Sequence, residues 1–444
     1  MDTLVDAERL LNARDPSGCL GVLEPMRARL GADEALTRLW LRALAELPRR
    51  ETLVSEVEAA LAVGSVDIAI AAAVALNGVA ALRPLDAPPP SADTPAGATA
   101  SMALSLCDAA LGQLEPKDAG VGFLHWQRAN ALRALGPERD EEAVDAYLAA
   151  TRAQPEHGPI WFDLCVLHKW RGRWQNALDC ALKARARLGD QRGVLWNAAI
   201  AATVLGQGDV AGGFWRDLGL PVRLGRGGMP VVDGAPNLQV RVPSRRSTYG
   251  LEDEPELGFE VLWVAPTSPC HGVVVSAAFR EHVIDHGDVV VWDGVPVATD
   301  PPVFPLLEQL HSSAQIRLAF VAIASPAQIA ELADGLSAPD ATLFATTPGA
   351  DAPASSGAPN GASNDASTDE QLVRGKLIAP EGTDLRALHA ALMAVLGRVP
   401  MKFAIPELYE SLQDTKRAGQ EHQAWRGVVR VAEKRGLLRK ASGG

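Results

Sequence analysis

One short stretch of the sequence gathers the residue types that bind metals or attack substrates. Within nineteen positions it holds Cys270, His271, His282, Asp285, His286 and Asp288. Thiolate, imidazole and carboxylate are the ligand types that zinc takes in proteins. Two of the histidines are four residues apart, so a helix would place both on one face. However, the run VIDHGDVVVWDG has the pattern of a turn leading into a strand, and no established zinc spacing is matched. We therefore expect no bound metal and no cofactor.

The same residues could instead form a nucleophile and its base. Cys270 would attack, and His282 or His286 would accept its proton. The neighbouring His271 would point away from Cys270 on an extended chain, because side chains alternate across a strand. The sequence contains no GxSxG or HExxH motif. We expect no catalytic residues and no enzyme activity, and we keep an enzyme or metal-dependent module centred on 263–293 as an alternative, with the helical half recruiting the partner.

The first half of the chain, residues 1–220, has the pattern of an all-helical domain. Ala, Leu, Arg and Glu dominate, and apolar residues recur at spacings of three and four. Breaks fall at Pro16, Gly31, Pro48 and Gly64. The Pro/Ala-rich stretch 83–99 predicts an exposed loop.

Three segments of this half align with one another at a period near 34 residues: 122–157, 158–191 and 192–220. The second holds Trp161, Leu164, Gly172, Trp174, Ala177 and Ala184, the first holds Gly136, Ala143, Tyr147, Ala150 and Pro155, and the third holds Gly206 and Ala211. Small residues let paired helices approach closely, aromatic rings fill the gap between them, and Gly or Pro ends each helix. Over 122–219 this pattern resembles the tetratricopeptide repeat (TPR) family.

The resemblance implies a superhelix of helix pairs that binds a peptide or protein partner in a concave groove. By alignment, the groove would be lined by Trp126, Asn130, Arg133, Phe162, Val166, Lys169, Trp170, Trp196 and Ile200. Aromatic rings offer large rigid contact areas, Arg and Lys pair with carboxylates, and Asn can bond a peptide backbone. The resemblance thus implies a scaffold protein that binds through its repeats.

After residue 220 the pattern changes to short Val- and Ile-rich runs bounded by Gly, Pro and Asp, which predict strands. These runs are NLQVRVP, FEVLWVAP, GVVVS, DVVVWDG, IRLAFVAIA and TLFAT, with predicted helices at FPLLEQLHSS and PAQIAELADGL. They indicate a small α/β domain over 221–347. Residues 348–370 lack core-forming residues and predict a disordered linker. Residues 371–414 predict a β-α-β unit that could complete the preceding sheet. The overall fold class is α+β, with several domains.

The last segment, 415–444, predicts a basic tail, with eight Lys/Arg against two acids. A regulator that contacts nucleic acid through this tail is a third hypothesis. The whole chain carries a formal charge of −12, which makes nucleic acid an unlikely partner for the protein as a whole and counts against anionic membranes. The apolar stretch 68–82 is too short to span a membrane. Five scattered cysteines without a CxxC indicate no disulfide framework, and a cytoplasmic location is expected.

Overall fold

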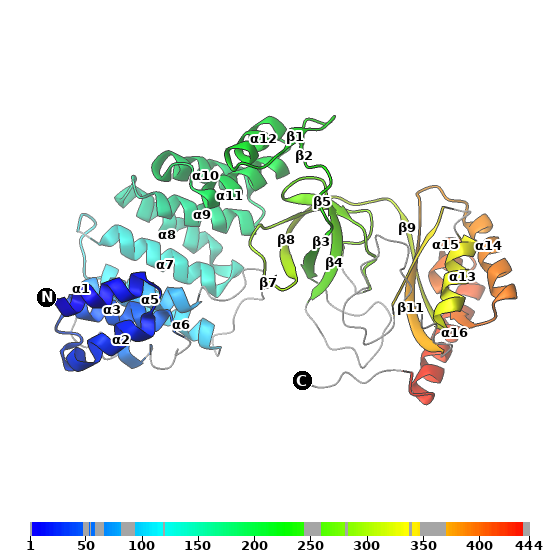
Figure 1. The fold of residues 1–444 in the computed structure, drawn as a ribbon, viewed down its shortest axis with the longest axis horizontal. Helices are drawn as coiled ribbons and strands as arrows, with labels where there is room; N and C mark the ends of the chain where they lie inside the picture. The colour runs from blue at the N-terminus through cyan, green and yellow to red at the C-terminus, as the bar shows by residue number, and fades with distance from the viewer. Residues whose placement is uncertain are drawn as a thin grey trace. The chain divides into compact units, whose positions relative to one another are not determined.

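The computed structural model divides the chain into two compact units, 1–229 and 230–444, each of which we describe by itself (Figure 1). The structure describes residues 2–47, 53, 55–57, 66–80, 94–118, 120–243, 259–279, 283–336, 340–346 and 370–437. The predicted linker 348–370, apart from its last residue, and most of the predicted loop 83–99 lie outside these residues. Among the described residues, no helix is long and apolar enough to cross a membrane.

The first unit is built of helices that follow one another through short turns. They are α1 (Asp2–Asn12), α2 (Pro16–Leu23), η1 (Glu24–Arg29), α3 (Glu34–Ala45), α5 (Val66–Ala80), α6 (Pro95–Leu111), α7 (Val121–Leu135), η2 (Pro137–Arg139), α8 (Asp140–Ala153), α9 (Gly158–Trp170), α10 (Trp174–Leu188), α11 (Arg192–Val204) and α12 (Gly208–Asp217), followed by the short strand β1 (Arg223–Leu224). Between α3 and α5, Leu53 and residues 55–57 are also helical. Helices α9 and α11 are each followed by a glycine at positive φ, Gly172 (66°) and Gly206 (70°), a conformation that glycine adopts without steric cost.

The helices of this unit pack as successive antiparallel pairs. Helix α1 packs on α2, α5 on α6, α7 on α8, α9 on α10, and α11 on α12. The first helices of the pairs also contact one another in series, from α1 through α3, α5, α7 and α9 to α11. Each second helix contacts the first helix of the following pair, as α6 does with α7 and α10 with α11. First helices that touch in series form the inner side of a stacked repeat, which is its concave side.

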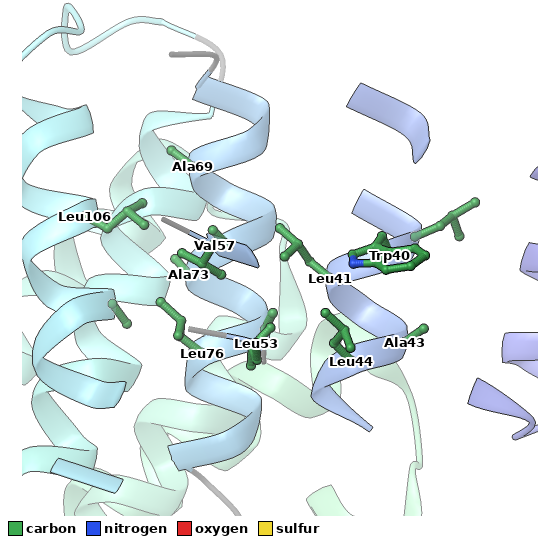
Figure 2. Packing of buried hydrophobic residues seen from close by; sticks show 14 of the residues in the cluster. Trp40, Leu41, Ala43, Leu44, Leu53, Val57, Ala69, Ala73, Leu76 and Leu106 are labelled. Carbon is green, nitrogen blue, oxygen red and sulfur yellow. The ribbon is translucent and has the colours of Figure 1, made fainter. Parts of the chain in front are cut away.

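The N-terminal pairs share one apolar core, which continues as far as α7. Figure 2 shows Leu41 and Leu44 of α3 and Leu76 of α5 among its members. Alanines such as Ala72 and Ala73 are fully buried between the helices. Because alanine adds so little bulk, the backbones of α3, α5 and α6 can lie close together.

The second unit begins with β2 (Pro230–Val231) and a closed barrel. Its strands are β3 (Leu238–Pro243), β4 (Phe259–Pro266), β5 (His271–Val274), β6 (Val289–Trp292), β7 (Ala298–Thr299) and β8 (Pro302–His311), in the order β3-β4-β5-β6-β8-β7. A parallel pairing of β3 with β8 closes the barrel, and Val240, Leu262, Val274 and Trp292 fill it.

The predicted helix FPLLEQLHSS is wrong, because residues 302–311 form strand β8. Its leucines fit helical spacing, but Phe304 and Leu306, two residues apart, both point into the barrel core. Pairing of β8 with β6, β3 and β7 overrides the local pattern.

A second sheet follows, with the antiparallel order β10-β11-β9-β12. Its strands are β9 (Ile316–Ala324), β10 (Thr342–Thr346), β11 (Gln371–Ala379) and β12 (Lys402–Ala404). Strand β11 pairs with β9 and β10, and β12 pairs with β9, so the strands of the predicted β-α-β unit complete the sheet that β9 and β10 begin. Helices α13 (Pro326–Leu336), α14 (Leu385–Arg398) and α15 (Pro406–Ser411) cover one face. From Leu318 to Ala324, strand β9 is buried on both faces, which explains why this part of its sequence is entirely apolar.

The predicted basic tail is an integral element over most of its length. Helix α16 (Thr415–Lys434) covers the face of the second sheet opposite to α13 and α14, because it packs on the alternate residues of β9. Its Val428 and Ala432 are buried against Val321 and Ile323 of β9. Asp414 caps its first turn by accepting a hydrogen bond from the Arg417 N–H at 3.0 Å. Residues 438–444 lie outside the described residues.

Candidate functional site

A cavity of about 1330 Å³ opens on the first-helix side of the helical unit. Its walls come mainly from two helices. Helix α3 contributes Glu34, Arg38, Arg42, Ala45 and Glu46, and α5 contributes Asp67, Ile70, Ala71, Val74 and Ala75. Leu11 at the end of α1, and Arg14 just after this helix, complete the lining. Val74 is 47% exposed, so part of the apolar wall of the cavity is open to solvent. The cavity thus combines apolar surface with charged groups of both signs.

The cavity residues repeat a spacing that the sequence assigned to the groove further along the chain. The predicted groove residues of α9 are Phe162, Val166, Lys169 and Trp170, at steps of four, three and one. The same steps join Arg38, Arg42, Ala45 and Glu46 on α3, and Asp67, Ala71, Val74 and Ala75 on α5. Equal steps give each set the same arrangement on its own helix, and the sets on α3 and α5 both line the cavity.

Further along this face, α7, α8 and α9 hold a group of hydrogen-bonded side chains. The indole N–H of Trp126 donates to Asp163 Oδ2 at 2.7 Å, which links α7 to α9. The Tyr147 hydroxyl donates to Asn130 Oδ1 at 2.6 Å, which links α8 to α7. Burial raises the pKa of Tyr147, so the phenol stays protonated and keeps this bond. Two predicted groove residues are therefore fixed in orientation by partners.

Aromatic rings extend this group at both ends. The ring centroids of Trp126 and His157 lie 5.1 Å apart, and those of Phe123 and His157 lie 5.3 Å apart. At the other end, Trp196 meets Trp215 edge to face at 5.0 Å. Such contacts hold flat side chains rigid, so little conformational entropy would be lost if they bound a partner.

The nine predicted groove residues differ in how much surface they present. Seven are half-buried: Trp126, Asn130, Arg133, Phe162, Val166, Trp170 and Trp196. Lys169 is 4% exposed, with its ammonium 5.7 Å from the centre of the Trp170 ring, and Ile200 is 0% exposed. Both lie beneath the surface and present almost no area to a partner, because they pack between the helices.

Sequence reasoning missed two parts of this face. Asp163 was passed over, although it lies one residue after Phe162 and 37 residues after Trp126, to which it bonds. The cavity over α1, α3 and α5 was missed because the repeat pattern is weak there. The spacing of Arg38 and Arg42 on α3 would have been the signal for it.

The alternative site around 263–293 is organised by ion pairs. Asp285 Oδ2 lies 2.5 Å from Lys376 Nζ of β11, and both side chains are at most 10% exposed. Asp288 Oδ1 lies 2.6 Å from Arg317 Nη2 of β9. These contacts tie the barrel to the second sheet within the second unit. In the described part of the chain, no group of three or more His, Cys, Asp or Glu side chains could hold a metal ion.

Among the described residues of this segment, His286 has a separate set of partners from His271 and Cys270, which both contact Ser268. His286 Nδ1 lies 2.9 Å from Gln315 Oε1, and the His286 ring packs on Phe344. His271 Nδ1 is hydrogen-bonded to Ser268 Oγ, and burial lowers the pKa of His271 to about 4. Ser268 also accepts backbone N–H bonds and is 0% exposed, so it serves a turn. Cys270 is 0% exposed, and His282 lies outside the described residues.

Comparison with known proteins gives a likeness of structure only. No family model matches the sequence, and no curated protein matches it. Among solved structures, the chain is similar to TTC0263, a thermophilic TPR protein of Thermus thermophilus, at 17% identity and a TM-score of 0.37, over 45% of this chain and 97% of that one. It is also similar to PilW, a type IV pilus biogenesis factor, at 15% identity and a TM-score of 0.38, over 49% and 90% of the two chains. A mutant of MamA matches at 15% identity and a TM-score of 0.28, over 42% and 98%. The chain is thus similar to TPR proteins over a little under half of its length.

Proposed function

We propose that this protein is a non-catalytic scaffold that binds a segment of a partner protein on the first-helix face of its helical unit. The bound segment would run from the cavity over α1, α3 and α5 toward Trp126 and Phe162. The observation that carries this proposal is the cavity itself, whose walls have the same residue spacing as the predicted groove of α9.

The dimensions and chemistry of the cavity favour a peptide over a small metabolite. Pockets for small molecules enclose roughly 300–1,000 Å³ and are mostly apolar. This cavity holds about 1330 Å³ and is lined by charged groups of both signs beside Val74 and Ile70. A peptide offers apolar side chains and charges of both signs along its length, so it can satisfy such walls.

The proposal excludes catalysis at the alternative site around 263–293. Asp285 and Asp288, the two carboxylates that the sequence groups with Cys270 and the histidines, are engaged with Lys376 and Arg317, so neither offers a free base. Ser268 and Cys270 are fully buried, so a substrate could not reach them without a rearrangement. These contacts support a structural role for the segment.

The test is to select peptides from a displayed random library on the immobilised full-length protein and to measure affinities for variants. Val74→Arg places a charge in the cavity, where Val74 is 47% exposed, and Val210→Arg is the matched control on α12, where Val210 is 44% exposed. We expect selected peptides to lose at least tenfold in affinity for Val74→Arg and less than twofold for Val210→Arg.

A second variant tests the other end of the face. Phe162→Ala removes a half-buried ring that packs near Gly193 of α11, at a position away from the cavity. Selected peptides long enough to span both ends should weaken here as well. The proposal is wrong if no peptide is enriched, or if the enriched peptides bind both Val74→Arg and Phe162→Ala as tightly as the unmodified protein.

A further inference from the structure

The outer surface of α16 is a row of cations. Lys416, Arg426, Arg430 and Lys434 are all exposed. On a helix of 100° per residue they fall within one side, opposite the buried Val428 and Ala432. None of the four forms an ion pair with any residue that the structure describes. We call these four residues the α16 basic face.

The acidic groups around the helix are engaged elsewhere. Glu421 accepts a hydrogen bond from the Ile405 N–H at 3.1 Å, on the inner side of the helix. Glu410 pairs with His422 at 2.7 Å, and Glu370 pairs with Arg435 at 2.5 Å. Glu433 is the one exposed carboxylate of α16 itself that flanks the basic face. The face therefore keeps a net positive charge after its neighbours are counted.

The geometry of the face suits an extended anion. Arg426, Arg430 and Lys434 follow one another at intervals of four residues, which places them about 6 Å apart along the axis. From Lys416 to Lys434 the face extends for about 27 Å. The helix is fixed on the second sheet through Val428 and Ala432, so the cations are presented on a rigid element.

The chemistry of the face distinguishes among polyanions. The positions between the cations on this side are Gly419, Gln420, Gln423 and Gly427, so no apolar side chain is exposed there. Protein interfaces rely on apolar and aromatic anchors, and interfacial membrane helices need a free apolar side. The apolar side of α16 is already buried against the sheet. A surface of charges and amides alone matches a phosphate backbone, which is bound through charge.

We propose that the α16 basic face binds the phosphate backbone of nucleic acid without regard to base sequence. This inference goes beyond the proposed function of the helical unit and does not depend on it. The net charge of −12 weakens the binding of polyanions to the protein as a whole. At distances beyond about 10 Å that repulsion is screened at 0.1 M salt, whereas the direct contacts are not.

The salt dependence gives the expected magnitude. Four phosphate contacts on duplex DNA give a slope of log affinity against log salt near −3.6, and on a single strand near −2.8. For the duplex this is a loss of roughly 150-fold between 50 and 200 mM salt.

The experiment measures fluorescence anisotropy of a labelled 20-base-pair DNA duplex and a 20-nucleotide RNA with the full-length protein. The test variant is Lys416→Gln/Arg426→Gln/Arg430→Gln/Lys434→Gln. A matched control, Arg152→Gln/Arg386→Gln/Arg398→Gln/Lys402→Gln, removes the same charge from exposed positions elsewhere. We expect at least tenfold weaker binding and a flatter salt slope for the test variant, and less than twofold change for the control.

Three results would overturn the proposal. One is no binding of either probe at 50 mM salt. Another is an equal loss of affinity in the control variant, which would indicate that binding depends on the net charge of the protein and not on the α16 basic face. The third is tighter binding of polyglutamate or of phosphatidylserine vesicles than of nucleic acid, which would assign the face to an acidic protein or a membrane. The milder Arg426→Gln/Arg430→Gln variant serves if the fourfold variant melts at a lower temperature than the control.

Discussion

The buried pair of Asp285 and Lys376 allows a quantitative test of how the second unit is held together. Lys376→Met removes the positive charge and keeps the length of the side chain. Asp285 would then lose the Nζ that lies 2.5 Å from Oδ2, but its Oδ1 would keep the N–H groups of Ala278 and His286, each at 2.8 Å. Breaking a buried pair costs about 3–5 kcal/mol. Because two donors remain on the carboxylate, we expect the lower end, about 3 kcal/mol.

The pH dependence of this loss follows from a second acid. Burial raises the pKa of Glu407, and the charge of Lys376 lowers it. Without Lys376 the pKa of Glu407 rises further above its value in the unfolded chain. A raised pKa contributes stability at low pH, and that contribution is lost as pH rises through the folded value. Relative to the unmodified protein, Lys376→Met should therefore be more destabilised at pH 7 than at pH 4.5.

The assay is native-state hydrogen exchange followed by mass spectrometry, read on peptides from β5 and β11. A loss of about 3 kcal/mol corresponds to roughly 100-fold faster exchange where exchange requires opening of the unit. Arg139→Met is the control, because it breaks an exposed pair with Glu142 that is worth at most about 1 kcal/mol. Asp285→Asn/Lys376→Met should recover part of the loss. We expect the control to change the exchange rate by less than threefold. The reasoning is refuted if Lys376→Met also changes the exchange rate by less than threefold.

Three further changes have defined outcomes. Gly375→Ala would place a Cβ in direct overlap with the buried Phe320 ring, so we expect a loss of about 2 kcal/mol in urea unfolding, whereas recovery of full stability would show that the ring can shift freely. Because His271 has a pKa near 4 when folded and about 6.5 when unfolded, lowering the pH from 7 to 5 should cost about 2 kcal/mol; His271→Gln should remove that part of the pH dependence, and an unchanged dependence would contradict the assignment. Tyr147→Phe deletes the hydrogen bond to Asn130 and should lower the free energy of unfolding, measured by thermal unfolding, by about 1 kcal/mol. An unchanged stability would argue against a structural role for that bond.

Sequence periodicity predicted the elements of the helical unit well where the repeats are regular. Between 122 and 220 the expected helix pairs are confirmed as α7 to α12, because small residues, glycine turns and apolar faces all indicate the same helices. The predicted strands β3, β4, β5, β6, β9 and β10 are confirmed for a similar reason, since each is a short β-branched run between turn residues.

The errors have a common cause in long-range contacts. Strand β8 has leucines at helical spacing, and only its three partner strands decide its conformation. The basic composition of α16 concealed Val428 and Ala432, whose partners in β9 lie about a hundred residues away. The cavity between α1, α3 and α5 depends on how three helices stack, so the spacing of Arg38 and Arg42 on α3 is the one local signal that points to it. Spacing alone also could not show that Ile200 lies beneath the groove surface.

The charged side chains of this protein fall into two groups. Some are buried in ion pairs and stabilise the fold, whereas others are exposed and available to a partner. Asp285, Asp288, Lys376 and Arg317 are each committed to an opposite charge within the second unit, although the two aspartates looked reactive in the sequence. Arg38 and Arg42 received no attention from motif reasoning, yet they are exposed on the wall of a cavity and form no ion pair with any described residue. The α16 basic face has the same property. A residue type and its spacing indicate which chemistry is possible, whereas the free or engaged state of the group decides whether that chemistry is available to another molecule.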